Sequence, residues 1–123
     1  MSNTFHDLYA DLLNTVFLEC ARQQLAQGED GLTCANTYAD QGKPDFALAY
    51  LLLADCAEEM KHDILAHAYE RRAILCDEKA SEFDQLYHRP FPLIKLEAQK
   101  DRMSAQQVRQ GRKVRRSGKS LNL

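Results

Sequence analysis

Apolar residues recur every three or four positions along most of this 123-residue chain, which is the spacing of residues on one face of an α-helix. Residues 4–27 carry the longest such stripe, and Gly28 is placed to end a helix there because glycine tolerates the left-handed conformation of a helix end. Asp30 can cap a second, shorter helix that ends at Gly42. Pro44 then suits the first turn of a third helix, where its missing amide costs no hydrogen bond.

The third helix is apolar on nearly every side. Its uninterrupted apolar run covers Phe46–Ala54, and Tyr50–Leu53 are consecutive, so they point around the whole circumference of a helix. The run is far shorter than the roughly 20 residues that cross a bilayer, so it predicts a central core helix and no transmembrane segment. Either the neighbouring helices enclose it or a second subunit does, which leaves a homodimer open.

No glycine or proline occurs between Asp45 and Arg89, so that whole segment is free to be helical. The apolar pattern pauses at Met60–Asp63, which predicts a turn there. A fourth helix then runs over residues 64–88, with Tyr87 on its inward, apolar side and charged residues outside. These elements predict an all-α fold of four antiparallel helices.

Charge and proline divide the chain into two parts. Residues 1–88 contain 6 Lys and Arg against 16 Asp and Glu, whereas residues 89–123 contain 10 against 2, so net charges of −10 and +8 make up the total of −2. Pro90 and Pro92 disfavour helical geometry in the residues before them. We therefore predict an acidic helical domain over residues 1–88 and a basic, proline-preceded C-terminal extension over residues 89–123, with at most a weak helix at Lys95–Gln110.

The second and third helices resemble one tetratricopeptide repeat. The stretch "ANTYADQGKPDFALAYLLLADCA" has small, aromatic and bulky residues at the positions of that repeat, without a gap: Ala35, Tyr38, Gly42, Ala47, Leu51 and Ala54. Gly31 stands where the family has tryptophan and Glu59 where it has proline, and only about one repeat, residues 31–63, matches. The resemblance implies a right-handed helical stack capped by the flanking helices, and a plain four-helix bundle is the alternative.

Four cysteines stand apart in the chain: Cys20, Cys34, Cys56 and Cys76. None forms the close pair that zinc sites and thioredoxin-like motifs require, and each lies at an apolar position of a helical pattern. They are predicted to be reduced core residues that pack as small hydrophobes. The N-terminus lacks the basic leader of a secretory signal, which predicts a cytoplasmic protein.

Residues capable of catalysis or metal binding form no recognisable motif. Glu59 and His62 have the Glu-x-x-His spacing of ferritin-like metal bundles, with Glu19 as a third ligand, but the chain has no second pair of this kind. It also has no nucleophile elbow and no glycine-rich phosphate loop. We therefore predict no enzyme and no cofactor, and a ferritin-like metal-binding bundle is the least favoured alternative.

The C-terminal extension carries the strongest functional signal. Six Lys and Arg fall within residues 109–119, and an apolar stretch with two prolines precedes them. Segments that mix apolar and basic residues are typical of docking tails, so we predict an adaptor that binds a larger protein assembly through its helical face and this extension. The predicted partner-binding residues are Phe91, Leu93, Ile94, Arg109, Arg112, Lys113, Arg115, Arg116 and Lys119.

Other partners are compatible with the same basic residues. They could neutralise phosphates of RNA or DNA, as in a nucleic-acid-binding or ribosome-associated protein, or of an anionic lipid surface. No aromatic residue follows Phe91, so nucleic-acid binding would involve the phosphate backbone and would weaken with salt. An acidic protein surface, on a partner or on a second copy of the chain, is the third option.

Overall fold

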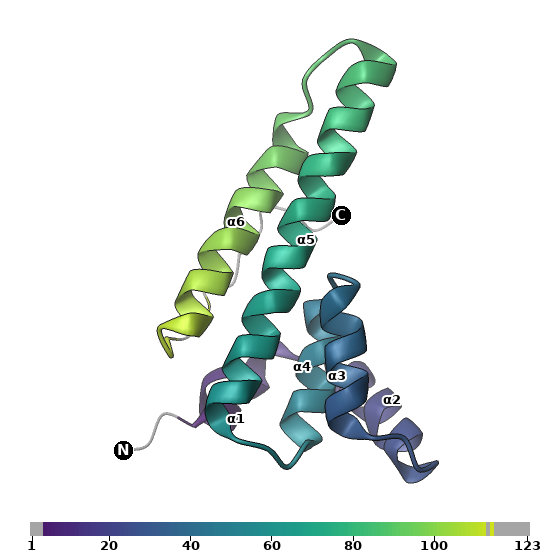
Figure 1. Cartoon of the computed structure of the whole chain (residues 1–123), viewed down its shortest axis with the longest axis vertical. Helices are drawn as coiled ribbons and strands as arrows, with labels where there is room; N and C mark the ends of the chain where they lie inside the picture. The colour runs from purple at the N-terminus through teal and green to yellow at the C-terminus, as the bar shows by residue number, and fades with distance from the viewer. Residues whose placement is uncertain (1–3, 113, 115–123) are drawn as a thin grey trace.

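The computed structural model describes residues 4–112 and 114. Every regular element within these residues is helical, which confirms the predicted all-α class. The elements are α1 (Phe5–Tyr9), the 3₁₀ helix η1 (Ala10–Leu12), α2 (Thr15–Ala26), α3 (Gly31–Asp40), α4 (Pro44–Leu53), α5 (Glu58–Tyr87) and α6 (Pro92–Arg109). Figure 1 shows α1–α4, which we call the body, gathered around the lower half of a long hairpin of α5 and α6.

The N-terminal stripe is divided into three elements, so the prediction of one helix over residues 4–27 is wrong, and so is the total of four helices. Leu13 is extended, and the side chain of Asn14 accepts a hydrogen bond from the Val16 amide at 3.0 Å. An asparagine that bonds to nearby backbone amides competes with helix continuation and favours a new N-terminus. The resulting bend lets α1 contact α5 while α2 packs on α4.

The turn before the longest helix lies earlier than the sequence predicts. Ala54 is extended, and α5 begins at Glu58 and continues through Met60–Asp63, so the turn predicted at those residues is wrong. Glu58 and Glu59 occupy the first turn of α5, where the helix dipole favours negative charge. The two carboxylates therefore favour a helix start before the polar stretch.

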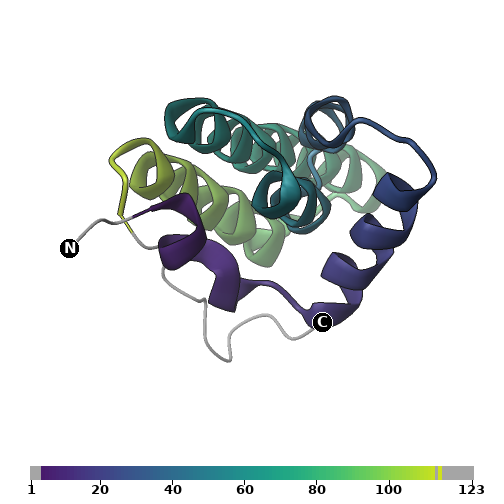
Figure 2. The same cartoon turned by 90° about the horizontal axis from the view of Figure 1, so that it is seen from below.

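Helices of the same chain enclose α4 at the centre of the body. It contacts α1, α2, α3 and α5, and Figure 2 shows these helices around it. Five consecutive residues of α4 are buried: Ala47, Leu48, Ala49, Tyr50 and Leu51. The sequence leaves two explanations for this apolar helix, cover by neighbouring helices or cover by a second subunit. The neighbouring helices account for the burial without a second subunit.

The turn between α3 and α4 requires glycine. Gly42 has a φ of +70°, and a Cβ atom there would lie 2.9 Å from Leu75 Cδ1 and 3.0 Å from the Arg72 amide nitrogen. The predicted helix end at this glycine is confirmed. Because the turn rests directly on α5, Asp40 Oδ1 comes within 2.8 Å of His67 Nε2.

The antiparallel pair α5 and α6, which we call the arm, packs through small residues. The buried residues of α6 recur at intervals of three and four positions: Ala98, Asp101, Ala105 and Val108. Small side chains allow two helices to approach closely. The segment expected to form at most a weak helix is instead an 18-residue helix packed against α5.

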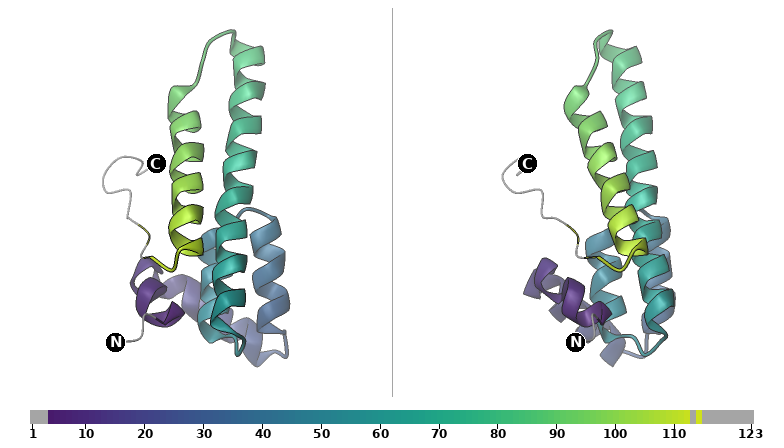
Figure 3. Two further views of the ribbon diagram at one scale, coloured as in Figure 1. Left: turned by 60° about the vertical axis from the view of Figure 1, so that its left-hand side comes forward. Right: turned by 90° about the vertical axis from the view of Figure 1, so that its left-hand side faces the viewer.

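One end of the arm extends beyond the body. At about 1.5 Å of rise per residue, the 30 residues of α5 span about 45 Å. By the same measure, the 10 residues of α3 and the 10 of α4 each cover about 15 Å. Figures 1 and 3 show that the turn joining α5 to α6 lies well past the ends of α3 and α4.

Candidate protein-interaction site

Three aromatic rings pack together where α5 turns into α6. The ring centroids of Phe83 and Phe91 lie 5.3 Å apart, and those of Tyr87 and Phe91 lie 5.8 Å apart. Edge-to-face contacts of this kind stabilise aromatic clusters beyond the area that they bury. Lys79 and Arg89 place their cationic groups over the Phe83 and Phe91 rings, at 5.6 Å and 5.5 Å. The cluster therefore fixes the turn and has a cationic rim.

Large apolar side chains remain exposed around this cluster. Leu86 is 62% exposed, Leu93 is 61% exposed and Tyr87 is 56% exposed. Apolar residues that gather at one exposed place are typical of protein-interaction surfaces. We call Phe83, Leu86, Tyr87, Phe91 and Leu93 the arm tip.

The predicted partner-binding residues fall into separate regions. Phe91 and Leu93 belong to the arm tip, and Ile94 lies half-buried beside them at the start of α6. Arg109 is the last residue of the same helix, about 27 Å from Phe91 along the helix axis. The apolar residues and Arg109 therefore do not form one compact docking surface.

Acidic residues of α5 hold Arg109. Its guanidinium donates to Glu70 at 2.7 Å and to Asp63 at 3.1 Å, and the hydrogen bond to Glu70 raises the pKa of Arg109. The backbone carbonyl of Arg112 accepts a hydrogen bond from the Tyr9 hydroxyl at 3.1 Å. The other predicted cations lie outside the described residues: Lys113, Arg115, Arg116 and Lys119. Phosphate binding by the basic segment stays a prediction, and Arg109 would have to leave two carboxylates to take part.

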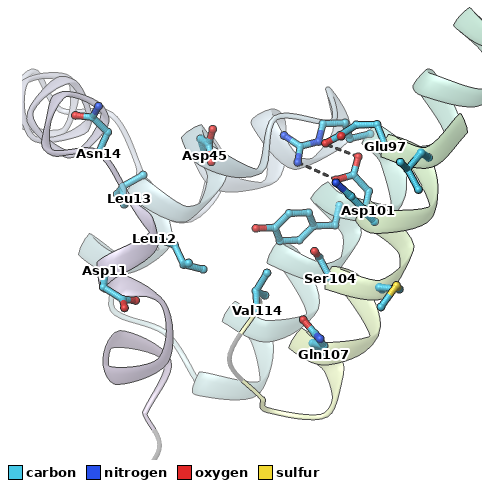
Figure 4. A pocket seen from close by; sticks show the side chains of 15 residues that line it. Asp11, Leu12, Leu13, Asn14, Asp45, Glu97, Asp101, Ser104, Gln107 and Val114 are labelled. Atoms are coloured by element: carbon cyan, nitrogen blue, oxygen red, sulfur yellow. Dashed lines mark hydrogen bonds and ion pairs between the residues drawn. The ribbon is translucent and has the colours of Figure 1, made fainter. Parts of the chain in front are cut away.

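A cleft of about 970 Å³ separates the α1–η1 segment from α6, with residues of α4 and α5 at its base (Figure 4). Arg72 and Asp101 form a bidentate ion pair in it, with Nε to Oδ2 at 2.9 Å and Nη2 to Oδ1 at 2.8 Å. Burial raises the pKa of Tyr69, another lining residue, to about 12. The described lining combines apolar side chains with charged and amide groups, so it offers both kinds of contact to a ligand.

The residues proposed for a ferritin-like metal site make other contacts or are exposed. His62 Nδ1 lies 2.8 Å from the backbone oxygen of Glu58, and its ring packs edge-on against Phe5 and Tyr9. Glu19 lies exposed on α2. Among residues 4–112 and 114, no three His, Cys, Asp or Glu side chains converge in an arrangement that could hold a metal ion. The ferritin-like alternative gains no support from this part of the chain.

The four cysteines are free thiols, and the prediction that all of them are core residues is wrong. Cys20 is exposed, and the other three are only partly buried. Ala21 is the one buried residue of α2, which packs on α4, whereas the adjacent Cys20 is exposed. Which side of α2 is covered depends on the bend at Asn14, and the apolar spacing alone does not determine it.

Sequence reasoning missed Leu86 and placed Tyr87 on an inward face. The spacing of apolar residues along α5 correctly indicates a helix, but it does not show how far the neighbouring helices reach. The relevant signal is length, because α5 has 30 residues while α3 and α4 have 10 each. The part of a helix that extends beyond its neighbours must contact another partner or be exposed to solvent.

Comparisons with known proteins do not extend this description. The chain matches no known family model, and comparisons with curated proteins and with solved structures found no similar protein. None of the helices in the described residues has the length and apolar character needed to span a membrane.

Proposed function

We propose that this chain is a non-catalytic protein-interaction module that docks onto a larger assembly through the arm tip. The observation that carries the proposal is the exposure of three large apolar side chains, Leu86, Tyr87 and Leu93, at the free end of a long helical hairpin. Within the arm, α5 packs against α1, α3 and α4 of the body and α6 packs along α5, so these contacts set where the tip lies. A preorganised surface loses little conformational entropy when a partner binds.

The chemistry of the arm tip favours an apolar partner surface with acidic groups at its edge. Tyr87 and the two leucines can fill pockets, and tyrosine in particular is enriched among residues that dominate interface energies. Lys79 and Arg89 lie at the rim, where they favour acidic groups of a partner.

The test compares tagged full-length chains in affinity capture from a lysate of the source cells, with quantitative mass spectrometry. The tip variant is Leu86→Ser/Leu93→Ser, and the matched control is Val16→Ser/Ile74→Ser, which changes two apolar residues exposed elsewhere. Burying a leucine contributes about 1.5–3 kcal/mol, so losing two removes about 3–6 kcal/mol and should weaken capture by at least about a hundredfold. The control should retain the partners of the unmodified chain.

Both variants must keep the circular dichroism spectrum and thermal midpoint of the unmodified protein, because only then does loss of capture report on the surface. Equal recovery of the same partners by the tip variant and the control would contradict the proposal.

We also propose that α3 and α4 pair as in a tetratricopeptide repeat, with α5 as the next helix of the stack. Support comes from the contacts of α5 with both helices and from the burial of Ala35, Ala47 and Leu51, three of the matching residues. An experimental structure whose α3–α5 arrangement superposes better on a plain four-helix bundle than on a repeat stack would contradict this part of the proposal.

A further inference from the structure

The short helix α1 bridges the open end of the arm, opposite the arm tip. The start of α5 and the end of α6 meet there, and Figure 3 shows α1 beside both. The backbone amide of Phe5, the first residue of α1, donates to Glu58 Oε2 at 2.6 Å, and Glu58 is the first residue of α5. From the last residue of α1, the Tyr9 hydroxyl donates to the Arg112 carbonyl at 3.1 Å, just after α6. One five-residue helix therefore bonds to both helices of the arm.

Two aromatic side chains anchor α1. Phe5 and Tyr9 are both 0% exposed, and their ring centroids lie 4.8 Å apart. The His62 ring of α5 packs edge-on against both of them, with centroid separations of 5.3 Å and 5.5 Å. Burial raises the pKa of Tyr9 to about 12, so its hydroxyl stays protonated and remains a donor at neutral pH. The anchor therefore combines apolar packing with a directed hydrogen bond to the end of α6.

The order of α1 depends on its docking. Isolated helices shorter than about 12–15 residues are marginal in water, because nucleating a helix costs conformational entropy. Thr4 caps α1 by accepting from the Asp7 amide at 3.1 Å, but the Phe5 amide finds its acceptor on α5. Contacts with α4 and α5 therefore keep α1 helical, and undocking would unfold it as a unit.

The connection to α2 allows α1 to leave while the next helix stays in place. Leu13 is extended, and the side chain of Asn14 gives α2 its own N-terminal cap. α2 also has its own contacts with α4. The extended residue is therefore suited to act as a hinge between α1–η1 and the rest of the body.

One polar atom loses hydrogen bonds when α1 is docked. His62 Nδ1 is paired with the Glu58 carbonyl, but His62 Nε2 is buried and has no hydrogen-bond partner in the described structure. A buried polar atom without a partner forgoes the hydrogen bonds that water would provide. Because Phe5 and Tyr9 pack on this ring, undocking of α1 would return Nε2 to water. That gain offsets part of the packing that is lost.

We propose that α1 is a releasable clasp at the base of the arm, and that it controls how firmly the end of α6 is held. With the clasp docked, the backbone at Arg112 is tied to the body, three residues after Arg109 and its two carboxylate partners. With the clasp released, the last turn of α6 and the start of the basic C-terminal extension lose this tether. Coupling between two sites is reciprocal, so a partner that moves the backbone at Arg112 also releases α1. The inference does not depend on the function of the arm tip.

Hydrogen–deuterium exchange of the full-length chain, read by mass spectrometry, tests the clasp. In the unmodified protein, the amides of α1 should exchange faster than those of α4, because α1 opens without global unfolding. The amides of Gln110, Gly111 and Arg112 bond back to α6, so they report on its last turn. Exchange of α1 as slow as that of α4 would show that α1 opens only with the whole protein, and would overturn the proposal.

Tyr9→Phe removes the hydroxyl and keeps the ring. Exchange at residues 110–112 should rise about fivefold, which is the effect of losing one typical hydrogen bond. The matched control is Tyr87→Phe, which removes the hydroxyl of an exposed tyrosine at the arm tip and should leave these amides unchanged. Equal exchange at residues 110–112 in the two variants would overturn the proposal.

Phe5→Ser removes the larger part of the anchor. Exchange of α1 should approach that of an unstructured peptide, and exchange at residues 110–112 should rise at least as much as in Tyr9→Phe, while α4 stays as in the unmodified protein. Faster exchange of α4 would show that α1 is an inseparable part of the core. That result would overturn the proposal, as would an unchanged end of α6.

A glycine pair tests the reverse direction of the coupling. Gly111 has φ +68° and turns the chain towards Tyr9, so Gly111→Val should strain this turn and speed exchange of α1 by several-fold. Gly28→Val strains another turn of positive φ, after α2, and should leave α1 unchanged. Neither added side chain meets a neighbouring atom within 4 Å at its Cβ, so the two variants are matched. Equal exchange of α1 in both would overturn the proposal.

Discussion

Asp101 is the one buried charged side chain among the residues that the structure describes, and the packing of α6 on α5 depends on how it is paired. It is 2% exposed and accepts two hydrogen bonds from Arg72, whose side chain is 35% exposed. Burial lowers the pKa of Arg72, but the hydrogen bonds and charge of Asp101 outweigh this, and the pKa is raised. The two partners differ in burial, so removing one or the other should have different costs.

Replacing Arg72 should be the more damaging change. The variant Arg72→Met leaves a buried carboxylate without its cation, which costs about 3–5 kcal/mol of unfolding free energy. The variant Asp101→Asn keeps the shape and one acceptor, and it leaves an arginine that can reach water, so we expect a smaller cost of about 1.5–3 kcal/mol. The double variant Arg72→Met/Asp101→Asn removes both charges, so it should cost less than Arg72→Met alone, which leaves the carboxylate buried without its cation.

Urea unfolding followed by far-UV circular dichroism measures these free energies, and the double-mutant cycle gives the coupling between the two side chains. A cost of Arg72→Met no larger than that of Asp101→Asn would contradict this prediction, because the burial of the stranded charge would then not set the cost. The prediction is also contradicted if the double variant loses as much stability as the two single variants combined.

Three further predictions concern the fold. Gly42→Ala should lower the unfolding free energy by more than about 2 kcal/mol, since its Cβ would meet the backbone of α5. Gly28→Ala, which shares a positive φ but has no atom within 4 Å of the added Cβ, should cost only about 1 kcal/mol in the same urea titration. Leu51→Ala should lower the thermal midpoint strongly, with a loss of about 2–5 kcal/mol, whereas Leu86→Ala at the exposed arm tip should leave it nearly unchanged. Burial raises the pKa of Tyr69 to about 12 from an unfolded value of 10.0, so its contribution to stability is fully present below pH 10 and is lost towards pH 12. Tyr69→Phe should make the decline of unfolding free energy over that range shallower, and an unchanged decline would contradict the assignment.

Local features of the sequence predict several elements correctly because they depend on short-range chemistry. The cap at Asp30 accepts from the Thr33 amide at 2.9 Å, Gly42 ends the following segment, and Pro44 begins α4. These residues act through their own backbone conformation or through groups within one turn, so no knowledge of distant segments is needed. The exposure of Leu93 could be anticipated in the same way, because an apolar side chain next to a proline has few local partners.

Helix boundaries and partners are less accessible to sequence reasoning. The helix break at Asn14 and the start of α5 at Glu58 both depend on polar side chains next to the boundary. The spacing of apolar residues is nearly the same whether the helix continues or stops at these positions. The engagement of Arg109 by Asp63 and Glu70 joins residues that lie 46 and 39 positions apart. A count of basic residues therefore treats Arg109 as available to a partner although the fold has paired it.

The helical class, the glycine-proline turn that joins two short helices, and the core position of the second of these can all be predicted from the amino-acid sequence. Spacing, capping and proline geometry are properties of a few consecutive residues, which explains why they suffice. The packing of the helices is needed to show that Asp101 is paired in a buried interface, that Cys20 faces outward and that the arm tip lies beyond every neighbouring helix. Those properties depend on which helix surfaces pack together and how far each helix extends, and the residue pattern along one helix gives information about neither.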